Sequence, residues 1–138
     1  MKSLLGKLGV ILIGLAIFGC AEVWGADWKF LKSDDDCSVY YDAQNITRPY
    51  TNIVRVWVRI DWTEKGVLFW AKFGKINENL SHLINLWEID CVEKKRRHLS
   101  RTDYDNKGGV IYSSSSPSKW DFIVPESRVE ALSKEVCK

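Results

Sequence analysis

The chain has 138 residues, with 20 basic and 18 acidic side chains, four cysteines and seven tryptophans. The two excess positive charges, Lys2 and Lys7, lie at the N-terminus, so the rest of the chain carries 18 charges of each sign. This balance gives no support to a general role in binding nucleic acid or anionic membranes, which requires a strongly basic surface.

Residues 1–19 have the layout of a secretory signal peptide. The two lysines are followed by eleven uncharged residues, Leu8 to Phe18, and then by small residues before a cut. A transmembrane helix needs about 20 apolar residues, so this run is too short for a permanent anchor. We therefore expect an exported protein.

Two modes of cleavage remain open at the end of this leader. The residues before Cys20 resemble a bacterial lipobox, in which Cys20 would carry a lipid and residues 20–26 would form a short tether. Ordinary cleavage after Ala21 or Gly25 would instead release a soluble protein. The first mode predicts an outer-membrane lipoprotein, and the second a protein of the periplasm or medium. In both, residues 27–138 form a single domain that is long enough to bury a core.

Three cysteines remain after the leader, which allows one disulfide and one left-over thiol in an oxidising compartment. We favour Cys91 with Cys137, a bridge that would pin the last turn of the chain to the middle of the fold. Chain-entropy arithmetic gives it on the order of 4 kcal/mol at most. Cys37 would then be buried or would pair between chains, and one sequence does not decide the pairing.

The domain begins with strand patterns. Trp28–Leu31 and Ser38–Asp42 are predicted strands that flank an acidic turn, and Asn45–Thr51, which contains a proline, is predicted as a bend.

The clearest strand is Ile53–Trp62, where valine and isoleucine alternate strictly with polar or aromatic residues. Arg55, Trp57 and Arg59 share the face opposite the valines. If the valine face is the core, Trp57 lies outside it between two arginines, while most other tryptophans are expected to fill the core.

In Glu64–Asn79, glycines interrupt both the helical and the strand pattern of apolar residues. This segment is predicted as a loop with a helical turn. The turn Asp105–Gly109 is a strong hairpin signal. Strands are predicted before and after it at His82–Cys91, Lys94–Tyr104, Val110–Ser113 and Trp120–Val124.

The spacing of apolar residues changes from a strand pattern to a helical one after Ser127. Glu130 follows Ser127 three residues later, as in a capping box. Val129, Leu132 and Val136 then recur at helical spacing. Strands followed by one helix predict an α+β fold, in which a small antiparallel sheet of about five to six strands packs a C-terminal helix on one face.

The densest charge run, Lys94–His98, has two interpretations. It is either a binding stripe for an acidic partner or a solvated edge strand whose lysines discourage aggregation. Together with the Trp57 face, it makes up the candidate binding patch of Lys94, Lys95, Arg96, Arg97, Arg55, Trp57 and Arg59.

Catalytic chemistry has little support in the sequence. His82 and His98 are sixteen residues apart without a glutamate at metalloprotease spacing, so we expect no metal site and no cofactor. Asp42, Asp90 and Asp121 are available as acid and base, but any protein of this size offers such carboxylates. No catalytic residue is assigned.

Several short stretches together resemble one family. They are Tyr40-Tyr41-Asp42, Ile46, Val54-Arg55-Val56-Trp57-Val58, Asp90-Cys91, Arg96-Arg97 with Leu99, Trp120 with Ile123-Val124-Pro125 and Ser127, and Val136-Cys137. Over roughly 28–137 the chain resembles the surface-adhesin protein E family of bacterial lipoproteins. The resemblance implies an antiparallel sheet with a C-terminal helix, a lipid anchor, the Cys91–Cys137 bridge and a binding role without catalysis. The family's named member binds host matrix proteins and can dimerise.

These observations favour a non-enzymatic cell-envelope protein that binds a macromolecule, either protein or glycan, through its sheet face or the Lys94–His98 run. No nucleic acid is expected as a partner, and the membrane is a partner only through a lipid on Cys20. Two alternatives stay open. One is a periplasmic enzyme or enzyme subunit, and the other is a structural component that forms a homodimer through Trp57.

Overall fold

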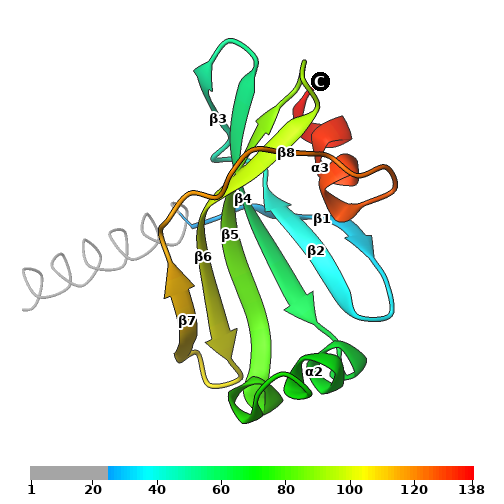
Figure 1. Ribbon diagram of the computed structural model, residues 1–138, viewed down its shortest axis with the longest axis vertical. Coiled ribbons are helices and arrows are strands. Elements are labelled where there is room, and N and C mark those ends of the chain that lie inside the picture. Colours follow the sequence, from blue (N-terminus) through cyan, green and yellow to red (C-terminus); the bar gives the residue numbers. More distant parts are fainter. Residues whose placement is uncertain (1–24) are drawn as a thin grey trace, which may run out of the picture.

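One antiparallel sheet of eight strands dominates the computed structural model, which describes residues 25–138 (Figure 1). The strands are β1 (Trp28–Ser33), β2 (Cys37–Asp42), β3 (Thr47–Tyr50), β4 (Ile53–Trp62), β5 (Leu80–Asp90), β6 (Lys95–Asp105), β7 (Val110–Ser114) and β8 (Asp121–Phe122). Six of them follow the order β1-β2-β4-β5-β6-β7, while β3 pairs with β4 and β8 with β6. The predicted α+β fold is confirmed, but the sheet has eight strands in place of about five to six, and β3 was not predicted as a strand. The predicted leader and the candidate lipid site at Cys20 lie outside the described residues.

The two faces of the sheet differ because side chains alternate along each strand. The helix face, which carries Val54, Val56 and Val58, packs against the C-terminal helix α3 (Arg128–Val136). The open face carries Arg55, Trp57 and Arg59, as the alternation in the sequence predicts. The main cluster of buried residues lies on the helix face and consists of Cys37, Val39, Val54, Val56, Val58, Ile89, Leu132 and Val136.

The expected cap of α3 is present with one difference. Ser127 Oγ accepts a hydrogen bond from the Glu130 N–H at 3.2 Å, as in a capping box. The Glu130 carboxylate does not return to Ser127 but accepts from the Glu126 N–H at 3.2 Å. Glu130 also forms an ion pair with Lys134, one helical turn later, at 3.4 Å.

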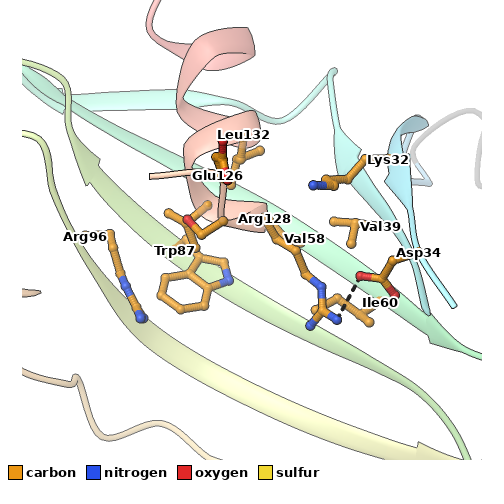
Figure 2. A pocket seen from close by; sticks show the side chains of 12 residues that line it. Lys32, Asp34, Val39, Val58, Ile60, Trp87, Arg96, Glu126, Arg128 and Leu132 are labelled. Carbon is orange, nitrogen blue, oxygen red and sulfur yellow. Dashed lines mark hydrogen bonds and ion pairs between the residues drawn. The ribbon is translucent and has the colours of Figure 1, made fainter. Parts of the chain in front are cut away.

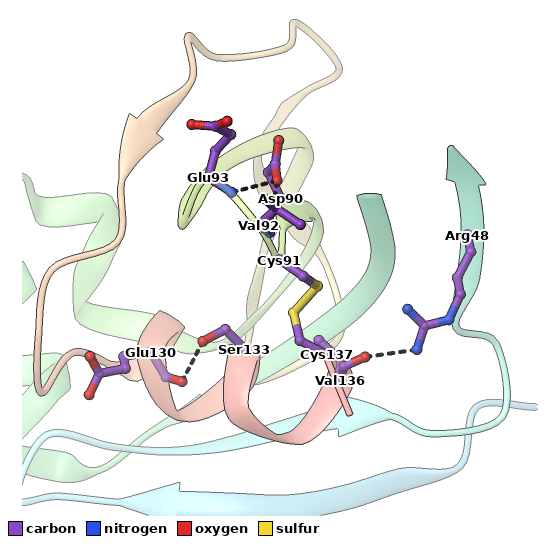
Figure 3. Close-up of a disulfide and its surroundings, with 9 residues drawn as sticks. All are labelled: Arg48, Asp90, Cys91, Val92, Glu93, Glu130, Ser133, Val136 and Cys137. Atoms are coloured by element: carbon purple, nitrogen blue, oxygen red, sulfur yellow. Dashed lines mark hydrogen bonds between the residues drawn. A yellow bond between two sulfur atoms is a disulfide. The ribbon is translucent and has the colours of Figure 1, made fainter. Parts of the chain in front are cut away.

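The far end of α3 is tied down by two contacts (Figure 3). The predicted Cys91–Cys137 disulfide joins it to the end of β5, across a sequence separation of 46. Arg48 Nη2 donates to the Val136 carbonyl at 3.0 Å, where a cation also interacts favourably with the negative end of the helix dipole. Cys37 is buried and forms no disulfide within residues 25–138.

Arg48 reaches the helix because its segment is a strand and not the predicted bend. The short strand β3 pairs Thr47 with Arg55 and Tyr50 with Ile53, beyond the end of β2 on the same edge of β4. Pro49 lacks an N–H donor, and an edge strand tolerates it because one side of that strand has no partner.

The segment predicted as a loop contains a helix, α2 (Glu64–Ala71), and a 3-10 turn, η1 (Lys75–Asn79), at one end of the sheet (Figure 1). Thr63 is the N-cap and accepts from the Gly66 N–H at 3.2 Å. Gly66 is buried, and a Cβ there would collide with the Asp36 carbonyl oxygen. The glycine that argued against a helix is therefore required for the helix to pack against the β1–β2 turn.

The tryptophans lie farther from the core than predicted. None of the six within residues 25–138 belongs to the fully buried core, although Trp62 and Trp87 pack at its margin. Trp57 is 37% exposed on the open face, as its position opposite the valines predicts.

Candidate functional site

Strand register assembles the open face from three neighbouring strands. Arg55 pairs with Glu88 on β5, and Glu88 pairs with Arg97 on β6. Trp57 pairs with Leu86 in the same way. Because paired residues in an antiparallel ladder share a face, these side chains form one continuous surface.

Glu88 lies at the centre of this surface with only 1% of its side chain exposed. Its two carboxylate oxygens each bind a different arginine. Oε2 accepts from Arg55 Nη2 at 2.8 Å, and Oε1 lies 2.7 Å from Arg97 Nη2. A buried carboxylate held by two charge-assisted hydrogen bonds is a strong, oriented contact.

Burial by itself raises the pKa of Glu88. The hydrogen bonds and positive charges of Arg55 and Arg97 outweigh that effect, so the pKa lies below its usual value of 4.5. Glu88 is therefore ionised at neutral pH. It holds both guanidinium groups in place while 38% of the Arg55 side chain and 30% of the Arg97 side chain remain exposed.

Aromatic rings accompany the cations on this face. The Arg97 guanidinium lies 4.8 Å from the Trp120 ring centre, and Lys95 Nζ lies 5.0 Å from that of Phe122. Trp120 is 36% exposed and Phe122 is 71% exposed. Both rings come from the segment around β8, which runs beside β6. Cations over aromatic rings give a face that offers charge and flat apolar area together.

Farther along the open face, Arg59 Nε donates to Asp61 Oδ1 at 2.7 Å. His82 stacks on Tyr104 with ring centres 4.8 Å apart. Burial, followed by the charge of Arg59, lowers the pKa of His82, while Asp61 opposes this change. The His82 imidazole is therefore harder to protonate than a solvent-exposed one.

The structure divides the predicted binding patch. Arg55, Trp57, Arg59, Lys95 and Arg97 share the open face. The other two predicted members do not belong to this surface.

Arg96 points to the helix face, where its guanidinium lies 4.8 Å from the Trp87 ring centre. Lys94 lies before β6 in a turn, with φ at 56°. The run Lys94–His98 is not an edge strand either, because β6 pairs with β5 on one side and with β7 and β8 on the other.

The carboxylates named as acid–base candidates have structural roles. Asp42 is buried and accepts from the backbone N–H groups of Asp27 and Gln44 and from the Asn45 side chain. Asp90 accepts from two backbone N–H groups of the turn that follows β5. Asp121 is exposed. Within residues 25–138, no group of three or more His, Cys, Asp or Glu side chains is arranged to hold a metal ion.

Sequence reasoning missed Glu88, the residue that organises the open face. The signal was an acidic residue inside the otherwise apolar strand His82–Cys91. A carboxylate on a central strand needs a cation across the sheet, and the strand Ile53–Trp62 offered one in Arg55.

The comparison with known families agrees with this architecture. A family model described as surface-adhesin protein E matches residues 28–138. The chain belongs to the surface-adhesin protein E family. A search of the curated proteins finds no match.

Membership in the surface-adhesin protein E family groups the chain with exported proteins of the cell surface. Neither helix in the described part of the chain has the length and apolar character needed to cross a membrane.

Proposed function

We propose that this member of the surface-adhesin protein E family is a non-enzymatic binding module of the bacterial cell envelope. Its open face binds an acidic macromolecule, either a glycan or a protein. The observation that carries the proposal is the pair of half-exposed arginines, Arg55 and Arg97, held by the buried Glu88 beside Trp57 and Trp120.

The arrangement suits binding for two reasons. Arginine and tryptophan are the residues that most often dominate the energy of protein interfaces. Arginines already held in place by Glu88 lose less conformational freedom on binding than free ones, which favours affinity. Two further cations lie on this face on either side of the Glu88 pair: Lys95, and Arg59, whose Nε binds Asp61.

A sulfated polysaccharide such as heparin is a suitable probe, and its binding is measured by titration calorimetry. Replacing Lys95 and Arg97 together with glutamine should weaken binding about tenfold, because two cations leave the face. The matched control is Lys72→Gln with Lys75→Gln, which removes the same charge from exposed positions at α2 and η1. This control should leave the affinity within about twofold.

Arg97 also supports Glu88, so its loss could act through folding alone. The pair Arg59→Gln with Lys95→Gln removes the same charge and leaves both partners of Glu88 in place. It should weaken heparin binding to a similar degree, with far-ultraviolet circular dichroism unchanged. If the open-face variants and the control variant bind heparin with equal affinity, the basic residues are only a solvated surface and the proposal is wrong.

We further propose that Cys20 is lipidated and anchors the protein to the outer membrane, with residues 20–26 as a tether, because the residues before Cys20 resemble a lipobox. Intact mass spectrometry of protein from the native membrane fraction tests this. A chain that begins at Cys20 with added acyl mass is the expected result. A chain that begins after Ala21 or Gly25 would make the protein soluble, and would strengthen the periplasmic alternative.

A homodimer is a second use for the same face, favoured by the 37% exposure of Trp57 between Arg55 and Arg59. An exposed tryptophan on a sheet face can anchor a self-complementary contact. Sedimentation of the wild type and of Trp57→Ala, over a wide concentration range, separates the two uses. A wild-type protein that stays monomeric at high concentration would exclude the dimer.

A further inference from the structure

A cavity of about 480 Å³ lies on the helix face, between the start of α3 and the sheet (Figure 2). All of its strand residues point away from the open face, so it is separate from the surface proposed above. The volume falls in the range of small-molecule sites, about 300–1,000 Å³.

The walls of the cavity are mainly apolar. Val58, Ile60 and Trp87 line it from the sheet, and Val129 and Leu132 line it from α3. In the view of Figure 2 the Trp87 indole lies between the Arg96 and Arg128 side chains. Such walls favour a ligand with an apolar body.

Charged groups stand at the rim, and the cations outnumber the carboxylates. Lys32, Arg96 and Arg128 line the cavity together with Asp34 and Glu126, which gives a net charge of +1. Arg128 is engaged, because its Nη2 lies 3.1 Å from Asp34 Oδ2. Within residues 25–138, neither Arg96 nor Lys32 has a carboxylate within ion-pair distance.

Arg96 is held in a way that leaves its hydrogen-bond donors available. Its guanidinium lies over the Trp87 ring, with 4.8 Å between the guanidinium carbon and the ring centre. This contact between a cation and an aromatic ring uses no hydrogen-bond acceptor, so the N–H groups of the guanidinium remain available to bind a carboxylate or phosphate.

The backbone at the rim is also unusual. Glu126 has a φ of 64°, in the left-handed region that a non-glycine residue seldom occupies. It directly precedes the N-cap of α3 and lines the cavity. Strained positions of this kind recur where a protein holds a ligand.

We propose that this cavity binds a small amphipathic anion, whose apolar body packs against Trp87 and whose carboxylate, phosphate or sulfonate group pairs with Arg96. Lys32, on the opposite side of the cavity in Figure 2, adds to the positive potential. The site is independent of the macromolecule-binding role of the open face.

The test uses two fluorescent probes with similar aromatic bodies, the anionic 1-anilinonaphthalene-8-sulfonate and the uncharged N-phenyl-1-naphthylamine. The sulfonate probe should bind the protein with one-to-one stoichiometry. Arg96→Gln should weaken that binding about tenfold, the usual effect of losing a hydrogen bond to a charged group. The uncharged probe should be insensitive to the same change. Arg59→Gln, which removes an arginine from the open face, is the matched control and should have no effect on either probe.

The location is tested on the wild-type protein, so the result does not depend on a variant that folds. In a nitrogen-15 spectrum of the indole groups, the Trp87 signal should shift and saturate with the sulfonate probe, while the Trp57 signal should not. An unshifted Trp87 would overturn the proposal. Equal effects of Arg96→Gln and Arg59→Gln would also overturn it, as would loss of probe binding in Phe73→Ser, whose ring is 68% exposed on the segment after α2.

Competition then identifies the apolar body. Displacement of the probe by dodecanoate supports an acyl chain, and displacement by 2-naphthoate supports an aromatic body. If neither carboxylate displaces the probe, the site does not bind amphipathic carboxylates and the proposal fails for that class.

Discussion

Glu88 shows how one residue can order a whole face. It is almost fully buried, yet both of its oxygens are used by arginines that remain half-exposed. Replacing Glu88, the buried member of both ion pairs, removes the charge that fixes the two guanidinium groups. The stability of the domain and the order of its open face therefore depend on the same carboxylate.

Glu88→Gln should lower the free energy of unfolding by about 1.5–3 kcal/mol at pH 7, the range for hydrogen bonds that involve a charged group. Because the folded pKa of Glu88 lies below its usual value of 4.5, the carboxylate stabilises the fold above that pH. Its contribution is lost as the pH falls through the folded pKa. Urea unfolding at several pH values should therefore show the difference between wild type and variant shrinking below about pH 4.5.

Glu78→Gln is the control for this prediction, since Glu78 is exposed and forms no ion pair within the described residues. It should change stability by less than about 0.5 kcal/mol. A difference between wild type and Glu88→Gln that stays constant down to pH 2 would contradict the proposed ionic role.

The close approach of Gly66 to Asp36 leads to a second prediction. Gly66→Ala should destabilise the domain by about 1–3 kcal/mol, because the added methyl group meets the Asp36 carbonyl and α2 must move away from the β1–β2 turn. Thermal unfolding measures the change. Gly74→Ala is the control, since a Cβ there meets only the Asn77 side chain, at 3.9 Å. Equal stability of the two variants would show that α2 can shift to accommodate the methyl group without loss of stability, and would contradict this prediction.

At the scale of elements, α3 is held by its cap, by Arg48 and by the disulfide. The Cys91–Cys137 bridge was favoured and was implied by the family resemblance, although the cysteines alone left the pairing open. The cap was predictable from the sequence, because Ser127 with Glu130 is a local signal. The Arg48 contact was not, because it joins residues 88 positions apart. Helix α2 was missed for a related reason. Gly66 lowers helix propensity locally, and only its contact with Asp36 explains why a glycine is needed there.

Removing the disulfide should cost about 2–4 kcal/mol of stability, since the bridge closes a long loop in the unfolded chain. The double variant Cys91→Ala with Cys137→Ala tests this by urea unfolding. Reductant should destabilise the wild type by a similar amount and have no further effect on the double variant. A fully stable double variant would mean that packing alone holds α3 on the sheet.

At the scale of the molecule, alternation along single strands predicted which residues share a face. Ile53–Trp62 placed Trp57 outside the core and between two arginines, as observed. The same rule separates Arg96 from Arg97, although the run Lys94–His98 suggested one basic stripe. Register between strands was not available from the sequence, so neither the Glu88 pair nor the cavity beside Trp87 could be predicted.

The resulting molecule has two chemically different sides. One presents ordered arginines and aromatic rings over the open sheet, and the other has an open pocket between α3 and the sheet. Salt should weaken binding on the open face strongly, because the contacts there are between exposed charges.

The most direct test of the open face is a nitrogen-15 spectrum of the tryptophan indole groups, recorded while a short heparin oligosaccharide is added. The proposed function predicts that the signals of Trp57 and Trp120 shift and saturate, while that of Trp87, on the helix face, stays in place. Shifts at Trp87 alone, or at no tryptophan, would contradict a binding role for the open face.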